Sequence, residues 1–187
     1  MNMGNYAHGN QPIQHMLYMY NYSGQPWKAQ HWIREVMDKL YTPAPDGYCG
    51  DEDNGQTSAW YVFSAMGFYP VCPGTDEYVL GTPYFKEMKL HLENGKTVTI
   101  SAPNNGDDKR YISKRTSNNA TLDVAGRDQQ DMKIHLVRDS ERLVWNFAKS
   151  ETDSASGNEA PDYYKEHNVT WSNRRNQKNS PVKDGDK

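Results

Sequence analysis

Three carboxylates stand in a row at Asp51, Glu52 and Asp53, between glycines at Gly50 and Gly55. In an extended turn, side chains two residues apart point to the same side, which would bring the two aspartates together and turn Glu52 away. Two converging carboxylates can deprotonate a water or bind a hard cation through oxygen. Glycines allow the backbone to bend sharply and to approach a ligand. The spacing therefore predicts a catalytic or metal-binding pair at Asp51 and Asp53.

The acidic run has two other possible interpretations. Acidic residues also stabilise the N-terminus of a helix by capping free amides, although one carboxylate would be enough for that. A calcium loop of the EF-hand kind is excluded, because counting from Asp51 the sixth position is Gln56 instead of glycine and the twelfth is Val62 instead of glutamate.

Helical patterns dominate the first part of the chain, where they would position the acidic run. Residues 16–22 are apolar or aromatic on all sides, and residues 27–41 carry one apolar stripe. A third helix, from about Gln56 to Met66, is apolar over most of its circumference and ends at Gly67, a typical capping residue. A helix this apolar needs neighbours on most sides, so we expect it to lie inside a helical layer larger than these segments supply.

Alternating patterns follow from residue 71 onward and predict strands. Asn94-Gly95 between two such segments predicts a hairpin with a two-residue connection. The strands are expected at residues 78–80, 88–92, 97–100, 111–113, 121–124, 132–136 and 143–147. From Ser150 onward aliphatic residues nearly vanish, and this composition predicts a polar, mostly disordered tail.

These patterns predict an α+β protein with three parts. Residues 1–70 would be helical, residues 71–149 an antiparallel β region, and residues 150–187 the tail. The net charge of −3 and the mixing of both signs exclude a phosphate-tracking surface, so nucleic acid is not an expected partner. No apolar run approaches the ~20 residues that span a bilayer, and the first residues lack the pattern of a signal peptide. Cys49 and Cys72 could be free buried thiols or one disulfide.

The stretch from Gly50 to Gly74 resembles the C-terminal signature of the glycoside hydrolase family 92 α-mannosidases. It reads GDEDNGQTSAWYVFSAMGFYPVCPG. Two further stretches are similar to the same family: Gly9-Asn10-Gln11-Pro12 with the segment up to Trp27, and the strand entry from Tyr78 to Phe85. The similarity runs without interruption from about Tyr6 to Asn105.

The resemblance implies a calcium-dependent, exo-acting enzyme that inverts the anomeric centre of terminal mannose in a glycan. It implies that the helices are part of a six-hairpin (α/α) barrel and that the protein works in the periplasm or outside the cell. The general base would come from Asp51 or Asp53. Asp53 would also be a ligand of Ca²⁺, with Gln14 as a second ligand.

The resemblance further implies that Asn10, Gln11 and His15 meet the sugar next to the scissile bond. Relatives that cut α-1,2 bonds tend to carry a His-Glu pair at the positions of Asn10 and Gln11, so this chain departs from that pattern. From the residues alone, Asn10-Gln11 could be a simple helix-entry turn, and His15 a structural histidine.

No stretch of this chain matches the family's general acid, which lies in an upstream motif. A base without an acid cannot protonate the leaving oxygen. We therefore expect a fragment with little or no mannosidase activity by itself, completed by the N-terminal part of the enzyme. The alternatives are a non-catalytic carbohydrate-binding or interaction module, and an inert truncation product that aggregates through an exposed apolar helix face.

Overall fold

The computed structural model describes residues 3–75, 77–107, 109–117, 120–123, 133–135 and 141–148, with side chains up to residue 112. The tail predicted for residues 150–187 lies outside these residues. In the described part, no helix is both long and apolar enough to cross a membrane.

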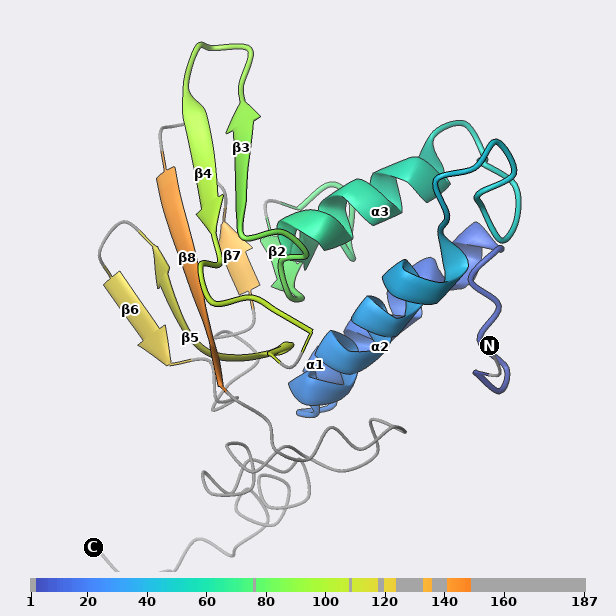
Figure 1. The fold of residues 1–187 in the computed structure, drawn as a ribbon, viewed down its shortest axis with the longest axis horizontal. Helices are drawn as coiled ribbons and strands as arrows, with labels where there is room; N and C mark the ends of the chain where they lie inside the picture. The colour runs from blue at the N-terminus through green and yellow to red at the C-terminus, as the bar shows by residue number, and fades with distance from the viewer. Residues whose placement is uncertain are drawn as a thin grey trace, which may run out of the picture.

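The helical segments occupy the first third of the chain (Figure 1). They are the 3₁₀ helix η1 (Gln11–Tyr18) and the α-helices α1 (Met19–Tyr22), α2 (Pro26–Leu40) and α3 (Gln56–Met66). The helix expected at 16–22 is thus the end of a 3₁₀ segment joined to one α-helical turn, and Pro12 is the second residue of that 3₁₀ segment. α2 begins at Pro26, because proline at the first helical position sacrifices no internal hydrogen bond.

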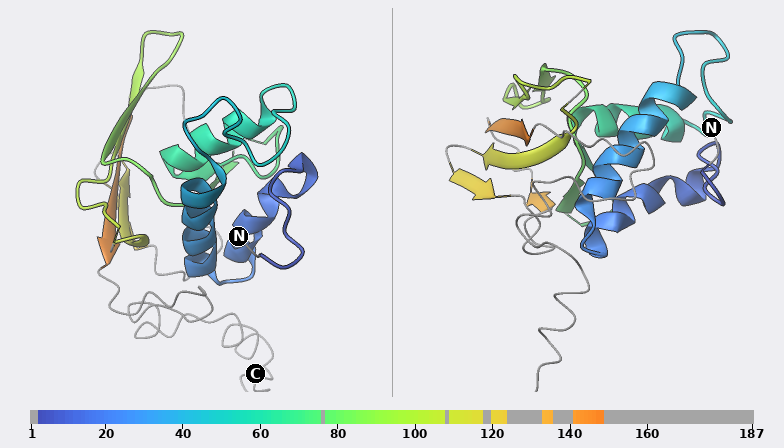
Figure 2. Two further views of the ribbon diagram at one scale, coloured as in Figure 1. Left: turned by 45° about the vertical axis from the view of Figure 1, so that its right-hand side comes forward. Right: turned by 60° about the horizontal axis from the view of Figure 1, so that its bottom comes forward.

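Two sheets follow the helices. The strands are β1 (Phe68–Tyr69), β2 (Glu77–Leu80), β3 (Glu87–His91), β4 (Thr97–Ser101), β5 (Tyr111–Ser117), β6 (Ala120–Asp123), β7 (Lys133–His135) and β8 (Glu141–Ala148). One sheet has the order β1-β2-β7 and the other β3-β4-β8-β5-β6. The helices and the larger of the two sheets form separate layers, as the views in Figures 1 and 2 show.

The expectation of a purely antiparallel β region is wrong in one place. β4 and β8 pair in parallel, with Val98 opposite Glu141, whereas the other pairs of strands are antiparallel. A parallel pair needs a long connection, and β8 reaches β4 only after the whole stretch that contains β5, β6 and β7. The β3–β4 hairpin is confirmed, but its loop is longer than two residues: the Leu92 amide donates to the Lys96 carbonyl at 2.9 Å, and Gly95 has φ 78°.

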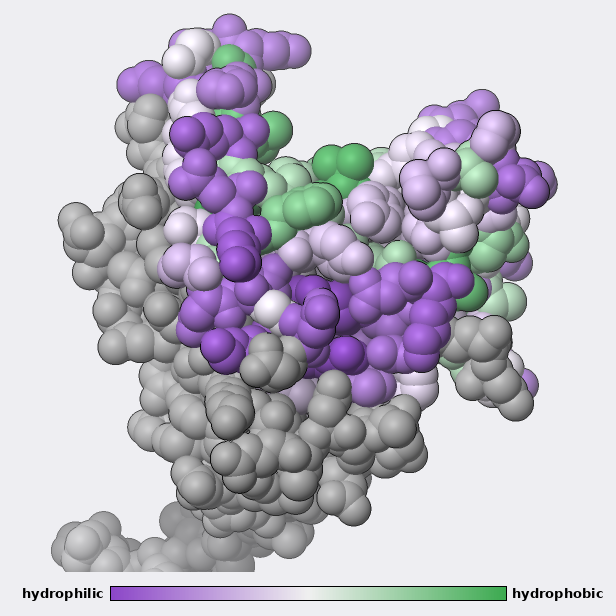
Figure 3. Space-filling view, viewed as in Figure 1, coloured by the Kyte–Doolittle hydropathy of each residue, from purple (hydrophilic) through white to green (hydrophobic). Residues whose placement is uncertain are grey.

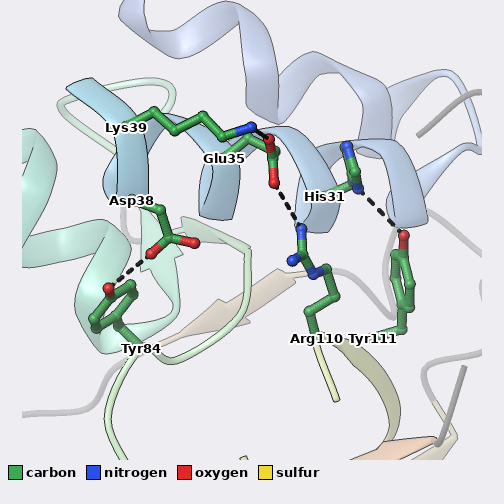
Figure 4. Close-up of polar contacts among 7 residues, drawn as sticks. All are labelled: His31, Glu35, Asp38, Lys39, Tyr84, Arg110 and Tyr111. Carbon is green, nitrogen blue, oxygen red and sulfur yellow. Dashed lines mark hydrogen bonds and ion pairs between the residues drawn. The ribbon is translucent and has the colours of Figure 1, made fainter. Parts of the chain in front are cut away.

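Polar side chains of α2 connect the helical layer to the sheets. Arg34, only 7% exposed, donates through Nη2 to the carbonyl oxygen of Pro83 and to Oδ1 of Asn105, each at 3.0 Å. Glu35 accepts from Arg110 at 3.0 Å just before β5 (Figure 4). The apolar core continues on both sides of this seam, around Trp60 among the helices and around Ile100 against the larger sheet.

α3 is less enclosed than its sequence predicts. Gly67 ends the helix as expected, with φ 92° and its amide bonded to the carbonyls of Phe63 and Ser64. Trp60 is fully buried, but Val62 is 51% exposed. Cys49 and Cys72 are both free and exposed, so neither a disulfide nor a buried thiol describes them.

Candidate functional site

The acidic turn, Asp51–Gly55, reverses the chain just before α3. Asp53, Asn54 and Gly55 have φ angles of 55°, 57° and 97°, so three consecutive residues adopt the left-handed conformation. Glycine adopts it without cost, and Asp and Asn tolerate it better than other residues. The residue types of the turn therefore follow from its backbone, and Gly55 becomes the N-cap of α3.

The three carboxylates of the run have different environments. Oε1 of Glu52 accepts a long bond of 3.4 Å from the Ser58 amide in the first turn of α3. Asp51 is exposed and Asp53 half-buried, and among the described residues neither carboxylate accepts a hydrogen bond or forms an ion pair. The capping interpretation thus fits Glu52 and leaves both aspartates available for a ligand. Whether their side chains converge on one point stays a prediction.

The turn is held against the segment that precedes η1 by a contact between two glycines. A Cβ atom on Gly50 would lie 2.4 Å from the Gly9 carbonyl oxygen, and one on Gly9 would lie 2.6 Å from the Cys49 carbonyl oxygen. No other residue type fits at this distance. The contact brings Asn10 and the acidic turn to the same end of the helical layer.

A buried network of hydrogen bonds connects the turn to α3 and to η1. Thr57 donates from Oγ1 to the carbonyl oxygen of Asp51 at 2.8 Å. Nε2 of Gln14, which is fully buried, donates to the carbonyl oxygen of His8 at 3.1 Å and lies 3.5 Å from Thr57 Oγ1. The Trp60 indole donates to the Gln14 carbonyl at 3.0 Å. Both ends of the acidic turn are therefore bonded to α3, and Thr57 links the turn to Gln14 of η1.

His8 anchors this network. It is 2% exposed, and its Nδ1 and Nε2 each lie 2.7 Å from a tyrosine hydroxyl, that of Tyr6 and that of Tyr41. Tyr41 donates its own proton to the Thr57 carbonyl at 3.3 Å, so it accepts from His8 Nε2–H while Tyr6 donates to Nδ1. Burial lowers the pKa of His8 to about 4, and burial also raises the pKa of both tyrosines. All three groups are therefore neutral at pH 7.

Comparison with known proteins shows the family of the chain. The family model of the glycosyl hydrolase family 92 catalytic domain matches residues 1–135. The chain belongs to this family. The resemblance seen in the sequence is thereby confirmed.

Three relatives match different shares of the chain. An inverting mannosidase from Bacteroides thetaiotaomicron VPI-5482 is 52% identical with a TM-score of 0.65, over 78% of this chain and 19% of its own. An α-mannosidase of Bacteroides thetaiotaomicron, solved with mannoimidazole, is 34% identical with a TM-score of 0.69, over 75% of this chain and 18% of its own. A secreted glycosidase of Arthroderma benhamiae, not yet characterised, is 27% identical over 59% of this chain and 14% of its own. The chain thus spans less than a fifth of the length of these relatives.

The family 92 residues expected to contact sugar or metal occupy different environments in the structure. Asn10 is exposed and precedes η1 without capping it through its side chain, while Gln11 and His15 are half-buried. Gln14 lies in the core, where its Oε1 accepts from Gln56 at 3.4 Å. The glycine contact brings the Asn10 segment to the acidic turn, but the roles of these residues stay predictions.

The histidine that the structure places at the centre of the network was not singled out in the sequence. His8 immediately precedes Gly9, yet nothing in the local pattern distinguishes it from a surface histidine. Its partner Tyr41 is 33 residues away, at the end of α2, and Thr57 follows in α3. Only the fold brings these residues together.

The acidic turn offers oxygen atoms that could bind a metal ion, but only a few of them. Among the described residues, no group of three or more His, Cys, Asp and Glu side chains is placed to hold a metal ion. Free aspartate oxygens suit a hard cation such as Ca²⁺, which takes roughly six to eight oxygen ligands. The turn could supply one or two of these, and the others would come from substrate, water or other parts of the enzyme.

Proposed function

We propose that this chain forms the general-base side of the active site of an exo-α-mannosidase. The enzyme would release terminal mannose and invert the configuration of its anomeric carbon. One observation carries the proposal. Two aspartates with no partner in the described chain stand on a left-handed turn that a glycine–glycine contact fixes against the Asn10 segment. The mannosidases among the solved relatives of family 92 support the same reaction class.

In the proposed reaction, a carboxylate of Asp51 or Asp53 accepts a proton from a water molecule. The water oxygen forms a bond to the anomeric carbon while the glycosidic bond to the leaving oxygen breaks. A general acid protonates that oxygen, so the products are free mannose and the shortened glycan. Because the water must fit between base and sugar, the acid and base carboxyls of an inverting enzyme stand roughly 6.5–9.5 Å apart.

Calcium is part of this proposal. Asp53 fits as a ligand, since its carboxylate is not engaged by other described residues. Gln14 fits less well, because its amide nitrogen is bonded to His8 and its oxygen accepts from Gln56 inside the core. When bound, the ion would hold the ring hydroxyls of the terminal mannose.

We further propose that the remainder of the catalytic domain completes the site. An apolar groove of about 610 Å³ runs between α3 and the β3–β4 hairpin, where Val62, Phe63 and Leu90 are among the residues that line it. Apolar side chains gather in this hollow in Figure 3. A helix as apolar as α3 is normally covered on most sides. This open face therefore suits packing against the part of the domain that supplies the general acid.

The proposed location is periplasmic or extracellular. The secreted glycosidase of Arthroderma benhamiae supports it. The substrate would be a mannose-containing glycan, such as an N-glycan under degradation.

A chimera tests the proposal directly. Residues 1–135 of this chain replace the corresponding part of the inverting mannosidase that is 52% identical, and mannose release from an aryl α-mannoside is measured with and without a chelator. We expect the chain alone to be inactive and the chimera to be active in a calcium-dependent manner. Asp53→Asn or Asp51→Asn should lower kcat by roughly 10²–10⁴-fold.

Glu93→Gln is the matched control, because this exposed acid lies in the β3–β4 loop away from the turn. An active chimera that tolerates both aspartate substitutions would show that the base lies elsewhere. Calcium-independent binding of mannosides without hydrolysis would instead favour a carbohydrate-binding module.

A further inference from the structure

A second concave surface lies beside the acidic turn and has no role in the proposed hydrolysis. It is a cavity of about 600 Å³ between the end of α2, the loop before the acidic turn and the outer side of α3. Four tyrosines line it, and we call it the tyrosine pocket. Its lining consists of Met37, Asp38, Tyr41, Thr42, Pro43, Tyr48, Ser58, Tyr61, Val62 and Tyr84.

We propose that the tyrosine pocket is a remote subsite that binds a further hexopyranose unit of the glycan whose terminal mannose lies at the acidic turn. The inference rests on the proposed function. It adds a substrate-binding surface that does not involve Asp51, Asp53 or a metal ion.

The rings provide the apolar half of such a site. Tyr48 is 43% exposed at the rim, while Tyr61 is half-buried, 4.8 Å from Tyr41 and 6.3 Å from Tyr84 between ring centroids. The C–H groups on one face of a pyranose form an apolar surface that packs on such rings. A tyrosine adds a hydroxyl at the edge, where the sugar's own hydroxyls lie.

A fixed carboxylate provides the polar half. Asp38 is exposed on α2, and its Oδ1 accepts from the Tyr84 hydroxyl at 2.7 Å (Figure 4). The Arg34 guanidinium lies over the Tyr84 ring, 4.8 Å from its centre, and this contact helps to fix the ring. The remaining acceptor sites of Asp38 suit the hydroxyl donors of a sugar. A proline-rich peptide, which also docks in aromatic grooves, offers mainly carbonyl acceptors that a carboxylate cannot satisfy.

The position of the pocket connects it to the proposed active site. Tyr48 lies three residues before Asp51, and its hydroxyl is 2.6 Å from Ser58 Oγ in the first turns of α3. Ser58 is also the residue whose amide donates to Glu52. A glycan that leaves the acidic turn along this side of α3 would therefore reach Tyr48 first.

Binding to the 187-residue chain in excess EDTA tests the proposal. A linear α-mannotetraose is titrated and followed by NMR, and methyl α-mannopyranoside serves as the monosaccharide probe. We expect the tetraose to bind without calcium, with Tyr48→Ala and Asp38→Asn each weakening it by roughly tenfold. Tyr48→Phe, which keeps the ring, should retain most of the affinity.

Met16→Ala is the control, because Met16 is 52% exposed and does not line the pocket. In the active chimera, Tyr48→Ala should raise KM for the tetraose by a larger factor than KM for a small aryl α-mannoside. An unchanged dissociation constant in Tyr48→Ala, preferential binding of a proline-rich peptide, or loss of all tetraose binding in EDTA would overturn the subsite. If calcium adds further binding on top of that seen in EDTA, and this added binding is unchanged in Asp53→Asn, the proposed role of Asp53 as a calcium ligand would be contradicted while the subsite would stand.

Discussion

The backbone of Gly9 lies directly against that of Gly50, so closely that a Cβ atom on Gly50 would be 2.4 Å from the Gly9 carbonyl oxygen. The two residues are 41 positions apart in the chain and belong to the two segments that carry the residues proposed for catalysis and for calcium binding. This contact makes the Asn10 segment and the acidic turn one unit. The pair of glycines is therefore a steric requirement of the site and not a flexible hinge.

Gly50→Ala should lower the free energy of unfolding by about 1–3 kcal/mol, because the new methyl group overlaps backbone atoms that cannot move independently. Urea unfolding followed by tryptophan fluorescence measures the change. Gly4→Ala separates this overlap from backbone strain: Gly4 has φ 65° and nothing within 4 Å of an added Cβ, so the expected loss is about 1–2 kcal/mol from strain alone. Equal stability of Gly50→Ala and wild type would refute the close contact.

Asp53 should tolerate Asn but not Ala. Its φ of 55° lies in the left-handed region, which costs an alanine roughly 1–2 kcal/mol and costs an asparagine less. We expect Asp53→Asn to unfold at nearly the wild-type urea concentration, and Asp53→Ala at a lower one. This difference makes Asp53→Asn the correct variant for activity measurements, and a destabilised Asp53→Asn would show that its carboxylate has a structural partner.

His8 should make the fold sensitive to acid between pH 6.5 and pH 4. The folded pKa of His8 is lowered by burial to about 4, below its ordinary value of 6.5, so the unfolded chain binds a proton that the folded chain does not. The contribution of neutral His8 to the free energy of unfolding is complete above pH 6.5 and is lost as the pH drops to 4. The loss is about 3 kcal/mol, at 1.36 kcal/mol per pH unit. Unfolding at several pH values measures the slope.

The His8→Gln variant serves as the reference for that slope. It removes the titrating ring and retains a polar side chain beside Tyr6 and Tyr41. Its stability should change less over the same pH range. Identical slopes in both proteins, or an NMR titration of His8 near pH 6.5, would contradict a buried neutral histidine.

Arg34→Ala should destabilise the protein by about 2–4 kcal/mol, because it removes two buried hydrogen bonds between α2 and the segments that follow β2 and β4. Oδ1 of Asn105 loses its Arg34 donor, and the Pro83 carbonyl oxygen keeps only the longer bond of 3.3 Å from Asn105 Nδ2. Lys39→Ala is the control, since Lys39 pairs with Glu35 on the exposed side of α2 and such pairs contribute roughly 0.5 kcal/mol or less. Thermal unfolding of both variants should give a much larger drop in Tm for Arg34→Ala.

Sequence patterns were sufficient for the elements that local chemistry controls. The apolar stripe of α2, the span of α3 and its end at Gly67 follow from helical spacing and from the left-handed conformation that glycine allows. Alternation located the strands within one or two residues for β2, β3 and β4. The acidic run and its family were recognisable for the same reason, since they are contiguous in the chain.

The tertiary structure alone decided which distant residues meet. It divided the carboxylates into Glu52, which accepts from the start of α3, and two aspartates that pair with none of the residues the structure describes. It also placed His8 between two tyrosines. It also paired β4 with β8 in parallel, against the antiparallel expectation. Local spacing specifies the conformation of neighbouring residues, whereas burial, hydrogen-bond partners and strand order depend on chain segments tens of residues apart, which no local pattern encodes.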